Sequence, residues 1–105
     1  MQQRSHLLFT NSIHSKDTLR VYQYSLDKFI EHFKLRDYDS LASMDPKMFQ
    51  TMVEDYLMEK KKEGKSRNTL QTPISALELF CDANDVIINW KKILLHRSST
   101  EDPAL

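Results

Sequence analysis

The sequence predicts an all-α protein that folds as one compact orthogonal bundle of four main helices. Of its 105 residues, 40% are apolar, which suffices for one hydrophobic core and is too little for two. Glycine occurs once and proline three times, so the turn residues that several β-hairpins would need are missing. Apolar residues recur instead at helical spacing, which favours helices.

The first part of the chain predicts an N-terminal arm followed by a helix. Residues 1–14 are mostly polar with a short apolar patch at 7–9 and show no sustained period, so we expect a flexible arm. Ser15 then stands where an N-cap should, with Asp17 in the first turn. Six apolar residues beyond it fall within about 100° of arc, so residues 16–33 predict a one-sided amphipathic helix. They are Leu19, Tyr22, Leu26, Phe29, Ile30 and Phe33.

Residues 34–44 break this period and predict a loop with room for one short turn at 40–44. Three of its residues can contact the core: Leu35, Tyr38 and Leu41. Asp45 before Pro46 is a strong helix start, because Asp accepts from free backbone N–H groups and proline lacks only an N–H that would be unpaired. We expect a central helix from Pro46 to about Glu63. Its apolar residues are Met48, Phe49, Met52, Val53, Tyr56 and Leu57.

Gly64, the only glycine, predicts the left-handed C-cap that ends this helix. Ser66 should cap the next helix, which carries a buried apolar stripe. The stripe comprises Leu70, Pro73, Ile74, Leu77, Phe80 and Cys81. Pro73 lies well past the first turn and removes one backbone hydrogen bond, so we expect a kink near Thr69.

Asn84 and Asp85 should close the third helix and lead into a short apolar crossing. Asn89 then caps a last short helix, residues 90–97. Its apolar residues would seal the core: Trp90, Ile93 and Leu94. Residues 98–105 are small, polar and aperiodic, and predict a linker toward a C-terminal domain that this chain lacks.

A set of capping and core positions supports a family resemblance. It consists of Ser15, Thr18, Tyr22, Leu26 and Phe29 in the first helix, and Ser66, Thr69, Leu70, Leu77 and Phe80 in the third. With the spacing of the four helices, this set resembles the N-terminal core-binding (SAM-like) domain of the tyrosine recombinase, or phage integrase-like, family. The closing Asn89, Trp90, Lys92 and Ile93 look most like archaeal integrases. The resemblance covers residues 15–97.

The resemblance implies a half-clamp on duplex DNA, with other recombinase protomers as partners of the full-length protein and a monomeric isolated domain. In the family a separate C-terminal domain cleaves the strand, using a tyrosine nucleophile and an arginine-rich phosphate pocket. None of those motifs matches this sequence. We therefore expect no catalytic residue and no enzyme activity in this chain, and its four tyrosines are not nucleophile candidates.

Positive charge gathers between Lys60 and Arg67, where five cations stand against one acid, Glu63. The formal net charge of the chain is zero, so this segment carries +4 and the remainder about −4. The balanced total argues weakly against DNA, because an excess of Lys and Arg normally supplies the attraction. The local charge argues for it. An alternative is structural, since lysines suit the negative end of the preceding helix.

The third helix places Arg67, Asn68, Gln71 and Ser75 on one arc opposite its apolar stripe. Arg pairs with guanine, Asn and Gln pair with adenine, and a capped helix start can bind phosphate. Acids farther along, at Glu78 and Asp82, should confine contact to the N-terminal half. A solvated face is the alternative. The predicted DNA-binding residues are Lys60, Lys61, Lys62, Lys65, Ser66, Arg67, Asn68, Thr69 and Gln71, then Lys16 and Arg20, with Lys91, Lys92, His96 and Arg97 ranked last.

Other function classes find little support. The four histidines show no metal-ligand spacing, no glycine-rich phosphate loop occurs, and no cofactor is expected. The lone Cys81 is expected to be a small buried hydrophobe. Without a membrane span or signal peptide, we expect a soluble, cytoplasmic, nucleoid-associated protein. The competing class is a helical protein–protein interaction module, suggested by Met48, Met52 and Met58, although methionines more often fill a core.

Overall fold

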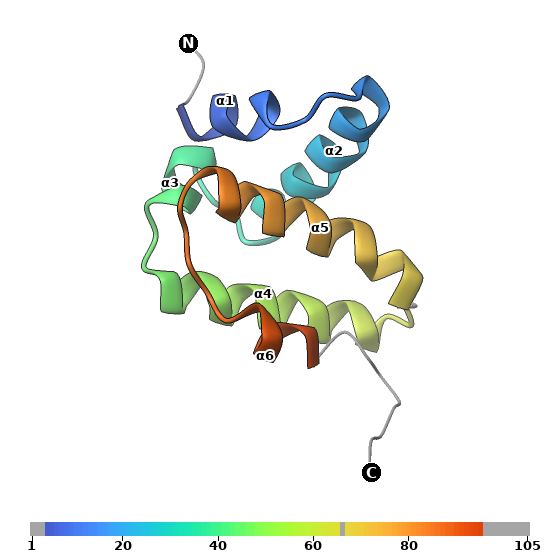
Figure 1. Ribbon diagram of the computed structural model, residues 1–105. Coiled ribbons are helices and arrows are strands. Elements are labelled where there is room, and N and C mark those ends of the chain that lie inside the picture. The colour runs from blue at the N-terminus through green and yellow to red at the C-terminus, as the bar shows by residue number, and fades with distance from the viewer. Residues whose placement is uncertain (1–3, 66, 96–105) are drawn as a thin grey trace.

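The computed structural model describes residues 4–65 and 67–95, without the side chains of Arg67, Asn68 and Leu95. This part of the chain forms six helices and no strand, which confirms the predicted all-α class (Figure 1). The helices are α1 (Arg4–Asn11), α2 (Lys16–His32), α3 (Tyr38–Ala42), α4 (Pro46–Lys62), α5 (Arg67–Ala83) and α6 (Trp90–Leu95). No described helix is long and apolar enough to cross a membrane.

Helix α5, rather than α4, is the central helix. In Figure 1 it lies between α1 and α2 on one side and α4 with α6 on the other, and it packs against both α1 and α2. Its buried residues lie on more than one face, since Ala76 is buried as well as the predicted stripe. On α4 the buried face is narrower than its apolar residues suggest. Met48, which is one of those apolar residues, is 56% exposed.

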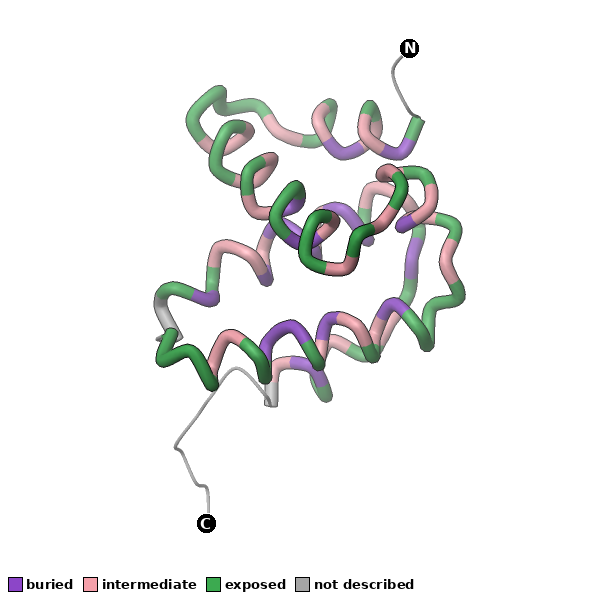
Figure 2. The backbone as a smooth tube through the Cα atoms, turned by 180° about the vertical axis from the view of Figure 1, so that it is seen from behind, coloured by how far each residue is buried: buried purple, intermediate pink, exposed green. Residues whose placement is uncertain are grey.

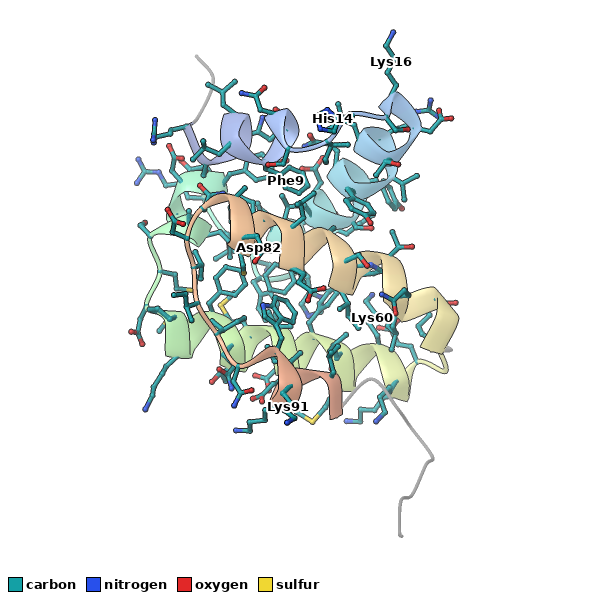
Figure 3. All side chains as sticks on the ribbon, viewed as in Figure 1. Phe9, His14, Lys16, Lys60, Asp82 and Lys91 are labelled. Atoms are coloured by element: carbon teal, nitrogen blue, oxygen red, sulfur yellow. The ribbon has the colours of Figure 1, made fainter. Side chains whose placement is uncertain are left out.

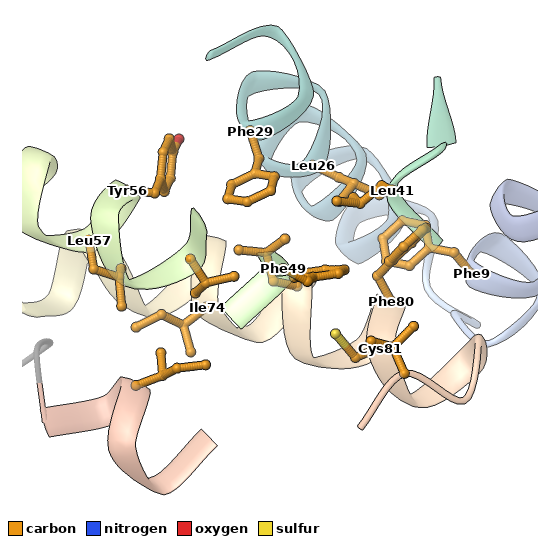
Figure 4. Close-up of a cluster of buried hydrophobic side chains, with 14 of the residues drawn as sticks. Phe9, Leu26, Phe29, Leu41, Phe49, Tyr56, Leu57, Ile74, Phe80 and Cys81 are labelled. Carbon is orange, nitrogen blue, oxygen red and sulfur yellow. The ribbon is translucent and has the colours of Figure 1, made fainter. Parts of the chain in front are cut away.

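One hydrophobic core joins all six helices. Figure 4 shows its side chains between α2, α4 and α5, and Figure 2 shows buried positions on the inward sides of these helices. The predicted stripe of α5 is confirmed except at Pro73, which is half-buried. The fully or almost fully buried residues are Phe9, Leu26, Phe29, Leu41, Phe49, Val53, Tyr56, Leu57, Leu70, Ile74, Ala76, Leu77, Phe80, Cys81, Val86 and Ile93.

The expectation of a flexible arm over residues 1–14 was wrong for residues 4–11, which form α1. Phe9 is fully buried, and its ring centroid lies 5.9 Å from that of Phe80 on α5. An eight-residue helix has barely two turns, too few for its apolar period to show in the sequence. The single buried aromatic residue, with the polar contacts of its neighbours, holds α1 to the bundle.

Those polar contacts reach α2, α3 and the turn that follows α5. The backbone N–H and the hydroxyl of Ser5 donate to Asp39 Oδ1 at 3.0 and 2.6 Å, and Asn84 Nδ2 donates to the Ser5 carbonyl at 3.2 Å. His6 Nε2 lies 2.7 Å from Gln23 Oε1. Ser5 is the one described polar residue that is buried in the core. Because its polar groups are paired, its burial carries little desolvation penalty.

Four N-caps were predicted; Ser66 lies outside the described residues, and two of the other three are confirmed. Ser15 Oγ accepts from the Thr18 N–H at 3.3 Å, and Asn89 Oδ1 accepts from the Lys92 N–H at 3.0 Å. Asp45 stands at the N-cap of α4, but its side chain makes no capping hydrogen bond, which corrects the expected role. Pro46 at the first helical position still fits the start of α4.

The predicted loop at 34–44 contains α3, whose N-cap is Asp37. Its carboxylate accepts from the Ser40 N–H at 2.8 Å, and the helix brings Leu41 into the core. Tyr38 therefore lies on a helix rather than in a loop. It packs against the core as expected, as does Leu35.

Gly64 ends α4 as predicted, with φ at 88° in the left-handed region. Its N–H donates to Lys61 O at 2.9 Å, and the Lys65 N–H donates to Lys60 O at 3.1 Å. This pair of bonds is the Schellman motif, which satisfies the last carbonyls of the helix. Lys34 takes the same left-handed conformation after α2, with φ at 53°, although it is not glycine.

The end of α5 closes at Asn84 and Asp85 as expected, and Asp85 also has a left-handed φ, at 57°. Helix α5 runs through Pro73 without a break, so the kink stays a prediction. In α6, Ile93 is fully buried, and both Trp90 and Leu94 pack against the core. The predicted contact of this helix with the core is therefore confirmed. The predicted linker, residues 98–105, lies outside the described residues.

Candidate nucleic-acid interface

The structure brings three of the predicted DNA-binding residues to one groove. Lys60 at the end of α4, Lys65 in the turn and Thr69 at the start of α5 all line it. The Schellman turn at Gly64 reverses the chain there, so α4 ends beside the start of α5 (Figure 1). The groove has a volume of about 480 Å³. Its lining residues are Tyr24, Ser25, Lys28, Glu31, His32, Tyr56, Lys60, Lys65, Thr69, Leu70 and Pro73.

Lys60 is held in place within this groove. Its Nζ lies 5.3 Å from the centre of the Tyr56 ring and 3.5 Å from Glu63 Oε1. The Lys60 side chain is only 26% exposed, whereas that of Glu63 is 44% exposed. Contact with the aromatic face and with the carboxylate limits the positions open to a flexible ammonium.

Lys28 is held in the same way from the opposite wall, on α2. Its Nζ lies 5.4 Å from the centre of the Tyr24 ring and 3.6 Å from Glu31 Oε1. Both members of this ion pair are largely exposed, at 51% and 75%. We call each set, Tyr24–Lys28–Glu31 and Tyr56–Lys60–Glu63, a Tyr–Lys–Glu triad.

The α2 triad is a feature that sequence reasoning missed. Both triads have the spacing Tyr-x-x-x-Lys-x-x-Glu, at residues 24–31 and 56–63. Residues at i, i+4 and i+7 share one face of a helix, so this repeated spacing was a readable signal. That the two faces meet across one groove depends on the packing of α2 and α4, which the spacing does not reveal.

The groove is electropositive. Three lysines and one glutamate line it, and His32 adds a ring that lies 5.1 Å, centre to centre, from that of Tyr56. Burial raises the pKa of the Tyr56 hydroxyl, and the charges of Glu63 and then Tyr24 add to this rise. The Tyr56 phenol is therefore neutral at physiological pH and can donate or accept a hydrogen bond.

The start of α5 presents polar side chains beside the groove. Thr69 and Gln71 are exposed, and Gln71 Nε2 donates to Ser75 Oγ at 3.0 Å, so these two residues share a face as the helical wheel predicted. Ser66 lies outside the described residues, as do the side chains of Arg67 and Asn68. On α4, Lys62 is exposed and Lys61 is half-buried.

The other predicted cations lie away from the groove. Figure 3 shows Lys16, at the start of α2, and Lys91, on α6, on opposite sides of the molecule, and neither lines the groove. Arg20 pairs with Asp17 at 3.1 Å, and both side chains are largely exposed, at 77% and 88%. Lys92 lies 3.7 Å from Glu54 Oε2 and so links α6 to α4. His96 and Arg97 lie outside the described residues.

Cys81 is buried in the core of the described part of the chain. Burial raises the pKa of the Cys81 thiol to about 12, with smaller effects from the charges of Asp82 and Glu78, so the thiol is neutral at physiological pH. Its burial confirms Cys81 as a core residue. Among the described residues, no group of three or more His, Cys, Asp or Glu side chains is placed to hold a metal ion.

Comparison with protein families identifies a match for most of the chain. A family model described as the phage integrase N-terminal SAM-like domain matches residues 5–83, about three quarters of the chain. The match begins in α1 and ends with α5, so it includes every wall of the groove. No curated protein and no solved structure matches the chain significantly.

Proposed function

The chain belongs to the phage integrase N-terminal SAM-like domain family, and on that premise we propose that it is the DNA-binding, core-binding domain of a site-specific tyrosine recombinase. It clamps duplex DNA from one side, while a separate C-terminal domain closes from the other and cleaves the strand in DNA integration and recombination. The partners of the full-length protein are duplex DNA and other recombinase protomers, and the nucleoid is its place in the cell.

The convergence of cations at the α4–α5 turn is the observation that supports this proposal. Lys60 comes from α4, Lys65 from the turn and Lys28 from α2, and Thr69 of α5 lies beside them in the groove. A cluster of lysines in a chain of zero net charge is an electrostatic footprint for an anionic partner. Lysine provides charge without planar geometry, so these residues act as phosphate contacts.

Sequence readout belongs to the start of α5 in this proposal. Arg67, Asn68 and Gln71 are the residue types that pair with the major-groove edges of guanine and adenine. Farther along α5, Glu78 is half-buried and Asp82 is exposed, and both would repel phosphates. In Figure 3, Lys60 lies near the start of α5, whereas Asp82 lies toward the other end of that helix. DNA contact is thus limited to the first half of α5.

The salt dependence of binding tests the proposal. Affinity for a duplex should fall steeply as salt rises, because each phosphate contact releases counterions. The double variant Lys61→Ala, Lys62→Ala should flatten the slope of log K against log salt by about 1 to 2. Lys47→Ala, at the other end of α4, is the matched control. Equal affinity at low and high salt would overturn the DNA proposal and favour a protein-interaction module, which could use the exposed Met48 and Met58.

Base readout is tested separately at Arg67. Arg67→Ala should cost about 1 to 3 kcal/mol on the cognate duplex and little on a random one. A selection from random duplexes would first supply the cognate sequence. A uniform loss across sequences would show instead that Arg67 is a phosphate contact.

A further inference from the structure

We propose that the groove between α2, α4 and α5 is a phosphate-group site that seats the phosphodiester backbone of DNA between the two Tyr–Lys–Glu triads. The inference rests on the proposed function and deepens it, since it names the group that occupies this groove. It also moves the contact made by α2 from the first turn, at Lys16 and Arg20, to the second half of the helix, at Tyr24 and Lys28.

The first argument is the matched geometry of the two walls. Lys28 and Lys60 lie at nearly equal distances from their tyrosine rings, 5.4 and 5.3 Å, and from their glutamates, 3.6 and 3.5 Å. Each ammonium is thus held before any ligand arrives, and both border one groove. Two ordered cations on opposite walls are the arrangement that an anion between them needs.

The second argument is that the ion pairs within the triads can exchange. Both pairs are partly exposed, and such pairs contribute little to folding stability. When DNA binds, a phosphate would displace each glutamate as the partner of the lysine ammonium group. The counterions bound to that phosphate would be released at the same time. In this view Glu31, which lines the groove, and Glu63, which pairs with Lys60, compete with the phosphate for the two ammonium groups.

The third argument is continuity with the start of α5. Lys65 and Thr69 line the groove and stand two residues on either side of Arg67 in the sequence. The Thr69 side chain is exposed and supplies a hydroxyl, and Ser25 supplies another from α2. A strand whose backbone lies in the groove therefore passes directly beside the residues proposed to read its bases.

Substitution of Lys28 tests the α2 wall. Lys28→Gln should weaken duplex binding by about 3- to 10-fold and lower the salt slope by about 1, uniformly across sequences. Lys60→Gln should do the same from the α4 wall. Lys47→Gln is the matched control, because Lys47 lies on α4 thirteen residues, or about 20 Å, from Lys60. If duplex binding persists and Lys28→Gln behaves like Lys47→Gln, the groove proposal is overturned and the proposed function stands.

The tyrosines provide a second readout. Tyr24→Ala removes the ring that holds the Lys28 ammonium and should weaken binding by about 2- to 5-fold. Tyr24→Phe keeps the ring face, so its loss should be smaller. Equal losses for the two variants would show that the hydroxyl rather than the ring matters, and would contradict the role given to the triad.

Titration with inorganic pyrophosphate separates the groove from the wider function. In NMR spectra of the whole chain, pyrophosphate should shift the backbone amides of Ser25, Lys28, Lys65 and Thr69 saturably, and the double variant Lys28→Gln, Lys60→Gln should abolish the shifts. If the wild type binds no duplex, the proposed function fails. Localised pyrophosphate shifts would then retain the groove as a phosphate site, whereas scattered or absent shifts would overturn that inference too.

Discussion

Helix α2 carries two polar faces, and they are used in different ways. On the face toward α1 and α3, Gln23 contacts His6 at 2.7 Å and donates to the Tyr38 hydroxyl at 2.6 Å, while Tyr38 donates to Asp27. One residue farther along the helix, Tyr24 and Lys28 face the groove. We call the first region the α1–α3 contact and compare it with the groove.

The difference lies in how the polar groups are satisfied. In the α1–α3 contact they bond to one another across three helices, so the contact fixes the position of α1. In the groove, Lys28 and Lys60 each form an ion pair with a glutamate three residues farther along the chain, and these pairs are partly exposed. Bonds between helices stabilise the fold, while pairs within one helix leave the groove walls open to a ligand.

The largest expected effect is on the α1–α3 side. Phe9→Ala should destabilise the fold by about 3 to 5 kcal/mol, because Phe9 is fully buried and its removal leaves a cavity against Phe80. Leu7→Ala on the same helix is the control and should cost about 1 kcal/mol or less, since Leu7 is 41% exposed. Urea denaturation measures both. Similar losses for the two variants would mean that α1 does not depend on Phe9.

Asp39→Ala should have a smaller effect on the same side. It removes the acceptor of two hydrogen bonds from the buried Ser5, at a cost of about 1 to 3 kcal/mol. Asp17→Ala removes an exposed partner of Arg20 and should cost about 1 kcal/mol or less. A loss for Asp39→Ala no greater than that for Asp17→Ala would contradict the structural role given to the α1–α3 contact.

The two sides also differ in how far the sequence predicts them. The helices α2, α4 and α5 were predicted within about a residue of their bounds, because caps and apolar periods act locally. Helix α1 was missed, since its stability comes from Phe9 and from partners up to 79 residues away in the chain. Part of the groove was predicted, since Lys60, Lys65 and Thr69 lie close together in sequence and were named as candidates. Lys28 was not predicted, because only tertiary packing brings it to them.

A third prediction concerns the turn that forms the groove. Gly64→Ala should destabilise the fold by about 1 kcal/mol, because the left-handed φ of 88° suits glycine, although a Cβ there would meet no atom within 4 Å. Lys34→Gly should stabilise by up to about 1 kcal/mol, since Lys34 holds the same conformation with a side chain. Thermal denaturation should give melting temperatures that move in opposite directions. A shift in the same direction for both would contradict the backbone argument.

The smallest effect expected is a change in acid sensitivity at Asp37, beside the α1–α3 contact. Hydrogen bonds from the Ser40 hydroxyl and backbone N–H, with a smaller effect of the Arg36 charge, lower the pKa of Asp37. A carboxyl with a lowered pKa stabilises the fold fully above its unfolded pKa of about 4, and this contribution is lost as the pH falls through the folded value.

Asp37→Asn removes that titration but keeps an oxygen that can cap α3. The melting temperature of the variant should therefore fall less steeply than that of the wild type as the pH is lowered below about 4. Ser40→Ala removes the hydroxyl donor but keeps the backbone N–H. Its melting temperature should therefore fall at low pH less steeply than that of the wild type and more steeply than that of Asp37→Asn. If the melting temperatures of all three proteins fall identically with pH, the Asp37 cap does not contribute to the pH dependence of stability.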